Sequence, residues 1–164
     1  MVLITGLPGT GKSTLAAALA AELNAHHLNT DRIREELNLK GKYDARTKKR
    51  IYEVMLQRTE ELLKTEQNVI VDGTFYQQKL RNRFQRLANR LGKDIRWIEL
   101  RANESTIRER VNKKRQYSEA DFEVYKKIKG LYEPLEQAHL VLWSDELSVE
   151  EMTKRAKDFL MLMA

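Results

Sequence analysis

Apolar and polar residues follow two patterns of spacing along the chain, and each pattern predicts one kind of secondary structure. Short apolar-rich runs bounded by polar residues or glycine predict strands. These runs occur at residues 2–5, 26–29, 68–72, 95–101 and 138–143. Between them apolar residues return every three or four positions, which is typical of amphipathic helices. The helical pattern is clearest in residues 47–66, 80–91 and 149–163, and Ser148 and Glu151 form a capping box before the last of these.

Strands that alternate with helices predict an α/β protein whose parallel sheet is covered by helices on both faces. We expect a single domain over residues 1–164, because no linker, internal repeat or low-complexity tract interrupts the pattern. A chain of 164 residues is also long enough to bury a substantial core.

Composition narrows the class of protein. Charged residues make up 33% of the chain, and no apolar run approaches the roughly 18 residues of a membrane span, so we expect no membrane partner. The absence of cysteine excludes a disulfide framework and a thiolate metal site. Because Met1 directly precedes the first expected strand, we expect no signal peptide, and a cytoplasmic enzyme is the simplest interpretation.

The strongest chemical signal is GLPGTGKS at residues 6–13. It matches the phosphate-binding loop G-x-x-x-x-G-K-[ST] and lies between an expected strand and an expected helix. In such a loop backbone N–H groups surround phosphates at a helix N-terminus. The expected nucleotide contacts are Gly6, Pro8, Gly9, Thr10, Gly11, Lys12, Ser13 and Thr14. Lys12 would reach the β- and γ-phosphates and the Ser13 hydroxyl would bind Mg²⁺, whereas a plain glycine turn would not need Lys-Ser there.

Asp31 and Arg34 follow the second expected strand. Ligands of open α/β sheets bind at the carboxyl ends of strands, so Asp31 is a candidate to accept the proton of an acceptor hydroxyl during in-line attack. Arg34 lies three residues further on the same helix face, where it could pair with Asp31 or hold an anionic group of the acceptor. The alternative is that Asp31 caps the helix and Arg34 is a solvated side chain.

Asp72 ends the apolar run VIV at residues 69–71 and precedes Gly73. A carboxylate at a strand end close to Mg²⁺ is the second signature of nucleotide-binding enzymes. Alone it is a weak signal, because an apolar run followed by Asp-Gly is also a common strand exit. The spacing leaves open whether Asp72 meets Mg²⁺ through water or orients Arg34.

A third candidate element is the arginine-rich helix near residues 103–115, with Arg108, Arg110 and Arg115. Ser118 and Asp121 would then start a new helix with a capping box, so a basic break separates two helices. We expect residues 103–121 to form a lid whose arginines neutralise charge on a transferred phosphoryl group, with Arg110 and Arg115 ahead of Arg108. A solvated basic helix is the alternative.

Basic residues are unevenly distributed. The net charge is +6, and residues 40–50, 75–93 and 101–115 hold 18 of the 30 basic residues but 3 of the 24 acidic ones. Single-sign segments of this kind favour contact with a phosphate backbone. Two faces of a small domain could equally share these charges.

The motifs GLPGTGKST, TDRIR, VIVDGTF and YEPLE, with the arginine-rich helix, resemble the P-loop kinases related to polynucleotide 5′-hydroxyl kinases and their small stand-alone relatives. The resemblance implies a P-loop NTPase fold, three-layer α/β/α, with a five-stranded parallel sheet in the order 2-3-1-4-5 and a helical lid. It implies ATP and Mg²⁺ as cofactors. It also implies that Asp31 activates the acceptor, Arg34 contacts it, and Asp72 and Thr74 support them or the metal, with Arg110 and Arg115 in the lid.

These inferences predict a kinase that moves the γ-phosphate of ATP to an acceptor hydroxyl. The basic segments favour a polynucleotide 5′-hydroxyl of DNA or RNA as the acceptor. A kinase of a small metabolite, such as a sugar, a nucleoside or an antibiotic, is the alternative, and an ATP-binding regulatory protein is the alternative from another class.

Overall fold

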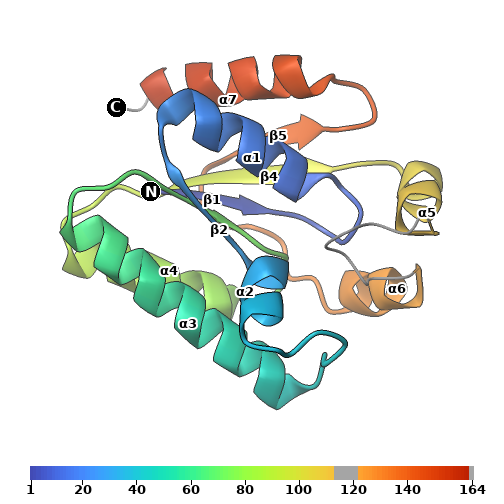
Figure 1. Ribbon diagram of the computed structural model, residues 1–164. Helices are drawn as coiled ribbons and strands as arrows, with labels where there is room; N and C mark the ends of the chain where they lie inside the picture. The colour runs from blue at the N-terminus through green and yellow to red at the C-terminus, as the bar shows by residue number, and fades with distance from the viewer. Residues whose placement is uncertain (113–121, 163–164) are drawn as a thin grey trace.

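Five parallel strands form one sheet at the centre of the computed structural model, which describes residues 1–112 and 122–162 (Figure 1). The strands are β1 (Val2–Thr5), β2 (His26–Asn29), β3 (Val69–Asp72), β4 (Arg96–Arg101) and β5 (His139–Trp143). Their order is β2-β3-β1-β4-β5, and every neighbouring pair is parallel. The expected α/β class and strand order are therefore confirmed, and each strand begins within one residue of its expected position.

The described residues form seven helices. They are α1 (Lys12–Leu23), α2 (Thr30–Glu36), α3 (Ala45–Lys64), α4 (Gln78–Arg90), α5 (Glu104–Asn112), α6 (Phe122–Gly130) and α7 (Val149–Leu162). Figure 1 shows α1 and α7 on one face of the sheet and α3 and α4 on the other, which gives the expected three layers. In this part of the chain no helix combines the length and the hydropathy that a bilayer crossing requires.

Strand β1 divides the core into two halves because its side chains alternate between the faces of the sheet. Val2 and Ile4 pack with the apolar residues of α1 and α7, whereas Leu3 packs with those of α3 and α4. All four residues of the strand are buried. The apolar run predicted from sequence is thus a central strand covered on both faces.

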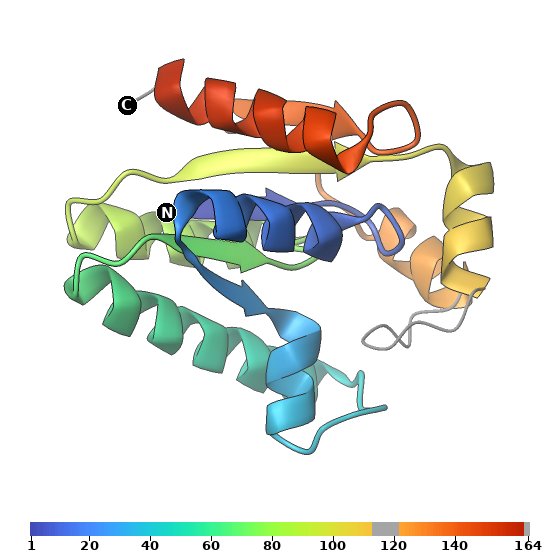
Figure 2. The same ribbon diagram turned by 45° about the horizontal axis from the view of Figure 1, so that its top comes forward.

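Helices α5 and α6 lie beyond the carboxyl ends of the strands, on the same side as the loop that joins β1 to α1 (Figure 2). This is the edge of an open parallel sheet at which ligands bind. The predicted lid, residues 103–121, falls only partly within the described residues. Arg115 and the expected capping box of Ser118 and Asp121 lie outside them.

Candidate active site

The loop between β1 and α1 adopts a conformation with positive φ at three glycines, Gly6, Gly9 and Gly11. Gly6 has a φ of 144°, and a Cβ added there would lie 2.3 Å from the carbonyl oxygen of Leu100. Gly11 caps α1 in the left-handed region with a φ of 90°, which a side chain would strain. The first turn of α1 contains no acidic residue. Its N-terminal N–H groups therefore remain attractive to a phosphate.

Side chains of this loop also form hydrogen bonds with its own backbone. Lys12 Nζ donates to the carbonyl oxygen of Leu7 at 2.9 Å, and the Thr10 hydroxyl donates to the same oxygen at 2.8 Å. Gly6 and Thr10 are buried and do not line the main cavity. The other expected nucleotide contacts, Pro8, Gly9, Gly11, Lys12, Ser13 and Thr14, line a cavity of about 220 Å³. The fold thus places the expected contacts on one continuous loop and helix turn.

Asn29, which sequence reasoning missed, joins three parts of this site. It is the last residue of β2 and stands in register with Asp72 of β3. Its Nδ2 donates to Asp72 Oδ2 at 2.6 Å and to Ser13 Oγ at 3.0 Å. Its Oδ1 accepts from the backbone N–H groups of Asp31 and Arg32, so Asn29 caps α2. The alternative interpretation of Asp31 as the cap is therefore wrong.

The carboxylate of Asp72 is buried and only half satisfied. Its Oδ2 accepts from Asn29 and lies 3.2 Å from His27 Nε2, whereas Oδ1 has no hydrogen-bond partner among the described residues. Burial would raise the pKa of Asp72, but the bond with His27 and the charge of Lys12 outweigh it and leave that pKa lowered. The site therefore holds an ionised carboxylate with one unused oxygen.

This carboxylate and the Ser13 hydroxyl fit the needs of Mg²⁺, which prefers oxygen ligands and keeps several waters or phosphate oxygens. Both residues line the cavity. Within residues 1–112 and 122–162 no group of three or more His, Asp or Glu side chains is arranged to hold a metal. An ion held here would consequently depend on phosphate oxygens and water for its remaining ligands.

Asp31 and Arg34 form an ion pair on α2, with Arg34 Nη1 2.5 Å from Asp31 Oδ1. The Arg34 side chain is buried and lies 4.5 Å from the centroid of the Tyr43 ring, while Asp31 is one-third exposed. Burial raises the pKa of Asp31, and the negative charge of Asp72 adds to this, while Arg34 acts in the opposite direction. A carboxylate with a raised pKa is a better proton acceptor near neutral pH.

The cavity that contains these groups continues away from the phosphate loop to a wall of aromatic and basic side chains. That wall is made by Tyr43, Lys48, Ile51, Tyr52, Thr74, Tyr76, Val124, Lys127 and Ile128. Thr74 is fixed there because its carbonyl oxygen accepts from the Thr5 hydroxyl at 2.8 Å and its Oγ1 lies 3.4 Å from the Tyr52 hydroxyl. The phosphate loop, Asp31, Arg34, Asp72 and Thr74 therefore share one cavity.

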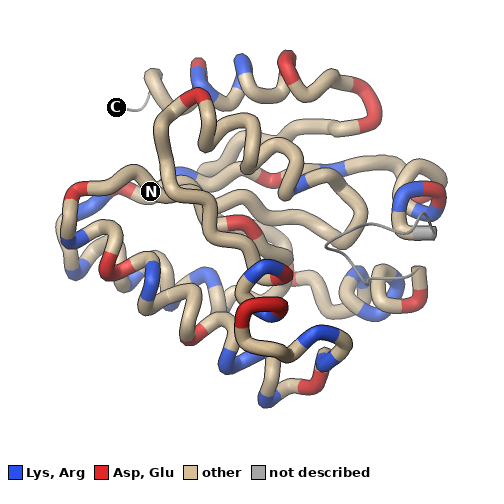
Figure 3. Tube along the Cα trace, in the orientation of Figure 1, with Lys and Arg blue, Asp and Glu red and all other residues tan. Residues whose placement is uncertain are grey.

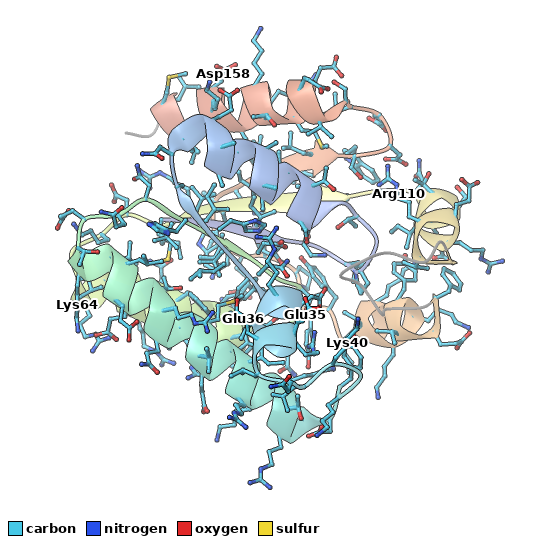
Figure 4. All side chains as sticks on the ribbon, viewed as in Figure 1. Glu35, Glu36, Lys40, Lys64, Arg110 and Asp158 are labelled. Carbon is cyan, nitrogen blue, oxygen red and sulfur yellow. The ribbon has the colours of Figure 1, made fainter. Side chains whose placement is uncertain are left out.

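Arg110 occupies a different position from these residues. On α5 it lies beside the loop after β5 (Figure 4), where its guanidinium donates to the hydroxyl and the carbonyl oxygen of Ser144 at 2.7 and 2.8 Å. Its Nη1 lies 4.0 Å from where a Cβ on Gly11 would be. Arg110 thus flanks the phosphate loop but does not line the cavity around Asp31. Arg108 stacks 4.4 Å over the Phe122 ring and joins α5 to α6.

The basic segment 75–93 is less available to a partner than its composition indicated. Arg81 is fully buried and donates to the carbonyl oxygens of Phe75 and Pro134, both at 2.8 Å. Arg90 pairs with Glu60, and Lys93 pairs with Glu66. Figure 3 shows acidic positions among the basic ones along α3, whereas α4 carries basic positions and no acidic ones. Half of the six basic residues in this segment therefore serve the fold or neighbouring carboxylates.

Comparisons with known proteins identify a family and a shared fold. A family model described as an AAA domain matches residues 1–135. A stretch of 100 residues is 32% identical to uncharacterized protein Rv2004c of Mycobacterium tuberculosis, covering 54% of this chain and 20% of that protein. An uncharacterized protein of Mycobacterium bovis matches equally. The chain thus spans about one fifth of the length of these relatives.

Solved structures share the whole fold. The Mycobacterium tuberculosis APS kinase CysC, in complex with AMPPNP and APS, has a TM-score of 0.77 at 19% identity, over 98% of this chain and 96% of that one. A gluconokinase from Sinorhizobium meliloti has a TM-score of 0.77 at 15% identity, over 99% and 92%. Chaetomium thermophilum Kti12, in complex with ADP-AlF3, has a TM-score of 0.72 at 15% identity, over 96% and 97%.

Proposed function

Because the chain belongs to the AAA domain family, we propose that it is an ATP-dependent kinase that transfers the γ-phosphate of ATP to an acceptor hydroxyl. The observation that carries the proposal is the single cavity in which the phosphate loop faces the Asp31–Arg34 pair. Kinase names among the structures of similar fold support it. We take residues 1–164 as one kinase domain.

On the donor side, the phosphate loop and the first turn of α1 would hold the triphosphate through backbone N–H groups. Lys12 would leave the Leu7 carbonyl oxygen, which it contacts in this structure, for the β- and γ-phosphates. Ser13 and Asp72 would hold Mg²⁺, which when bound neutralises charge on the phosphate oxygens. Charge stabilisation of this kind is the main contribution that a protein makes to phosphoryl transfer.

On the acceptor side, Asp31 would accept the proton of the attacking hydroxyl as its oxygen bonds to the γ-phosphorus. The bond from that phosphorus to the bridging oxygen then breaks, and ADP leaves. Arg34 keeps the carboxylate oriented through its ion pair. Arg110 and Arg115, in the lid of residues 103–121, would add positive charge beside the phosphates and exclude water when the lid closes.

Two acceptor classes are compatible with this mechanism. The basic segments support a polynucleotide 5′-hydroxyl of DNA or RNA and a kinase of the polynucleotide-kinase-related group. A small metabolite is supported by the APS kinase and the gluconokinase among the structures of the same fold.

The proposal is tested with Lys12→Ala and Asp31→Asn in parallel. Calorimetry should show that Lys12→Ala weakens Mg-ATP binding whereas Asp31→Asn retains it. Transfer from radiolabelled ATP to a panel of alcohols should fall by roughly 10²–10⁴-fold in Asp31→Asn. Folded protein that takes up no Mg-nucleotide would overturn the proposal. Full transfer activity in Asp31→Asn would contradict the role of Asp31 as proton acceptor, whereas Mg-ATP binding without transfer to any alcohol would leave a nucleotide-binding regulator.

A further inference from the structure

Three cationic side chains from three helices line the acceptor end of the cavity. Arg34 belongs to α2, Lys48 to α3 and Lys127 to α6. Arg34 is neutralised by Asp31. Neither Lys48 nor Lys127 forms an ion pair with any carboxylate in the part of the chain that the structure describes. This region therefore carries positive charge that the protein itself does not balance.

The three cations are close enough to affect one another. Partial burial lowers the pKa of Lys48, and the positive charges of Lys127 and Arg34 lower it further. Like charges held together in a partly dry site are unfavourable. An anion bound among them would reduce the repulsion between the cations and would offset the cost of removing them from water. The arrangement therefore favours a negatively charged ligand.

Aromatic rings hold two of these cations against the cavity wall. The Arg34 guanidinium lies 4.5 Å from the centroid of Tyr43, and Lys48 Nζ lies 5.6 Å from the centroid of Tyr76. Cation–π contacts of this kind fix a cation without neutralising its charge. Arg34 Nε is buried and has no hydrogen-bond partner among the described residues, which leaves one further donor at this end of the site.

We propose that Lys48 and Lys127, beside Arg34, form an anion subsite, and that the acceptor is a small alcohol carrying a phosphate, sulfate or carboxylate group. Its anionic group lies between the two lysines while its hydroxyl faces Asp31. The inference rests on the proposed function and narrows its substrate class. Both lysines line the same cavity as Asp31, so one small molecule can present its anionic group to them and its hydroxyl to Asp31, and the partly neutralised basic segment 75–93 argues against a polynucleotide strand.

The subsite is tested first without any catalysis. In a Lys12→Ala background, which weakens the phosphate loop, binding of inorganic phosphate is measured by calorimetry with and without Lys48→Met or Lys127→Met. Removing a charged hydrogen-bond donor should weaken this binding about tenfold or more. Lys49→Met and Lys126→Met, at the neighbouring exposed positions, should leave it unchanged. Phosphate affinity that is equal in all five proteins would overturn the subsite.

The substrate class is tested with pairs of alcohols that differ only in charge. A sugar is compared with its phosphate and its sugar acid, a nucleoside with its 3′-phosphate, and both with a 5′-hydroxyl oligonucleotide. Small anionic members should have a kcat/KM at least about tenfold higher than their neutral partners. Lys48→Met and Lys127→Met should reduce that preference by raising KM, with kcat within about twofold.

Equal rates with neutral and anionic members, or transfer to the oligonucleotide alone, would overturn the small anionic acceptor. Lysine-dependent phosphate binding in a protein that phosphorylates nothing in the panel would support the subsite and contradict the proposed kinase activity. Failure of the subsite and failure of the kinase proposal can therefore be told apart. The phosphate calorimetry needs no turnover, and the acceptor panel needs no assumption about which anion is bound.

Discussion

The two ends of the cavity are built in different ways. The donor end is one continuous segment, in which backbone conformation from Gly6 to Lys12 creates the phosphate cradle. The acceptor end is assembled from the side chains of α2, α3 and α6 and the loop after β3. A cradle of backbone N–H groups suits the phosphate groups that all nucleotides share. Side chains that come from distant segments can be substituted one at a time without changing the backbone. Under the proposed function, the first would fix the reaction class and the second would fix the acceptor.

The largest effect should come from breaking the backbone-built end. In Gly6→Ala the new Cβ would meet the Leu100 carbonyl oxygen at 2.3 Å in a left-handed conformation. We expect a loss of about 3 kcal/mol in the free energy of unfolding, measured by urea denaturation, and loss of nucleotide binding. Gly130→Ala is the matched control, because no described atom lies within 4 Å of its Cβ position. Equal stability of the two variants would contradict this account of the loop.

The next largest effect should come from the residue that connects the two ends. Asn29→Ala removes the cap of α2 and the bonds to Asp72 and Ser13. We expect a loss of about 2 kcal/mol in the free energy of unfolding, since a cap and a buried hydrogen bond each contribute about 1 kcal/mol. Asn89→Ala, on the exposed side of α4, should change it by less than about 0.5 kcal/mol. A wild-type urea midpoint in Asn29→Ala would refute the connecting role.

A smaller effect concerns the acidity of the acceptor end. Burial raises the pKa of Asp31 and the Arg34 charge lowers it, so Arg34→Gln should raise it further. Because Asp31 must be deprotonated to accept a proton, activity is lost as pH falls through its pKa. The acid limb of kcat/KM against pH should therefore move to higher pH in Arg34→Gln and stay in place in Arg50→Gln, an exposed position on α3. A limb that moves to lower pH would contradict the assignment.

The smallest effect is expected outside the cavity. Arg83 and Arg86 lie on α4 and do not line it. The double variant Arg83→Gln, Arg86→Gln should keep kcat/KM for a small acceptor within about twofold, because surface substitutions away from a site change little. A large loss confined to oligonucleotide acceptors, with a steep dependence on salt, would restore the predicted nucleic-acid contact.

The sequence predicted the parts of this molecule that depend on local pattern. The apolar runs predicted the strands and the fold class, and the strand order that the family resemblance implied is also confirmed. Helix α3 starts at Ala45 rather than at the expected Thr47, because the Asp44 side chain accepts from the Thr47 N–H and caps the helix earlier. Asp is a common N-cap residue, so the sequence contains the signal for this earlier start.

Long-range features could not be read from spacing. Asn29 meets Asp72 only because β2 pairs with β3 in one register. Lys48 and Lys127 share a wall only because α6 returns toward α3. Arg81 belongs to the basic segment 75–93, yet it is buried and donates to the carbonyl oxygens of Phe75 and Pro134. The roles of Asp31, Arg34, Asp72, Arg110 and Arg115 remain predictions, and Arg115 lies outside the described residues.

The side chain of Asn29 carries a consequence for the timing of the reaction. Its nitrogen is bonded to the Ser13 hydroxyl, and its oxygen restrains the first turn of α2. A nucleotide that contacts Ser13 would therefore affect Asp31 through the side chain of Asn29, which contacts both residues. Amide hydrogen exchange in the first turn of α2 should slow when nucleotide alone is added. Binding of the nucleotide would then order the acceptor site before the acceptor binds.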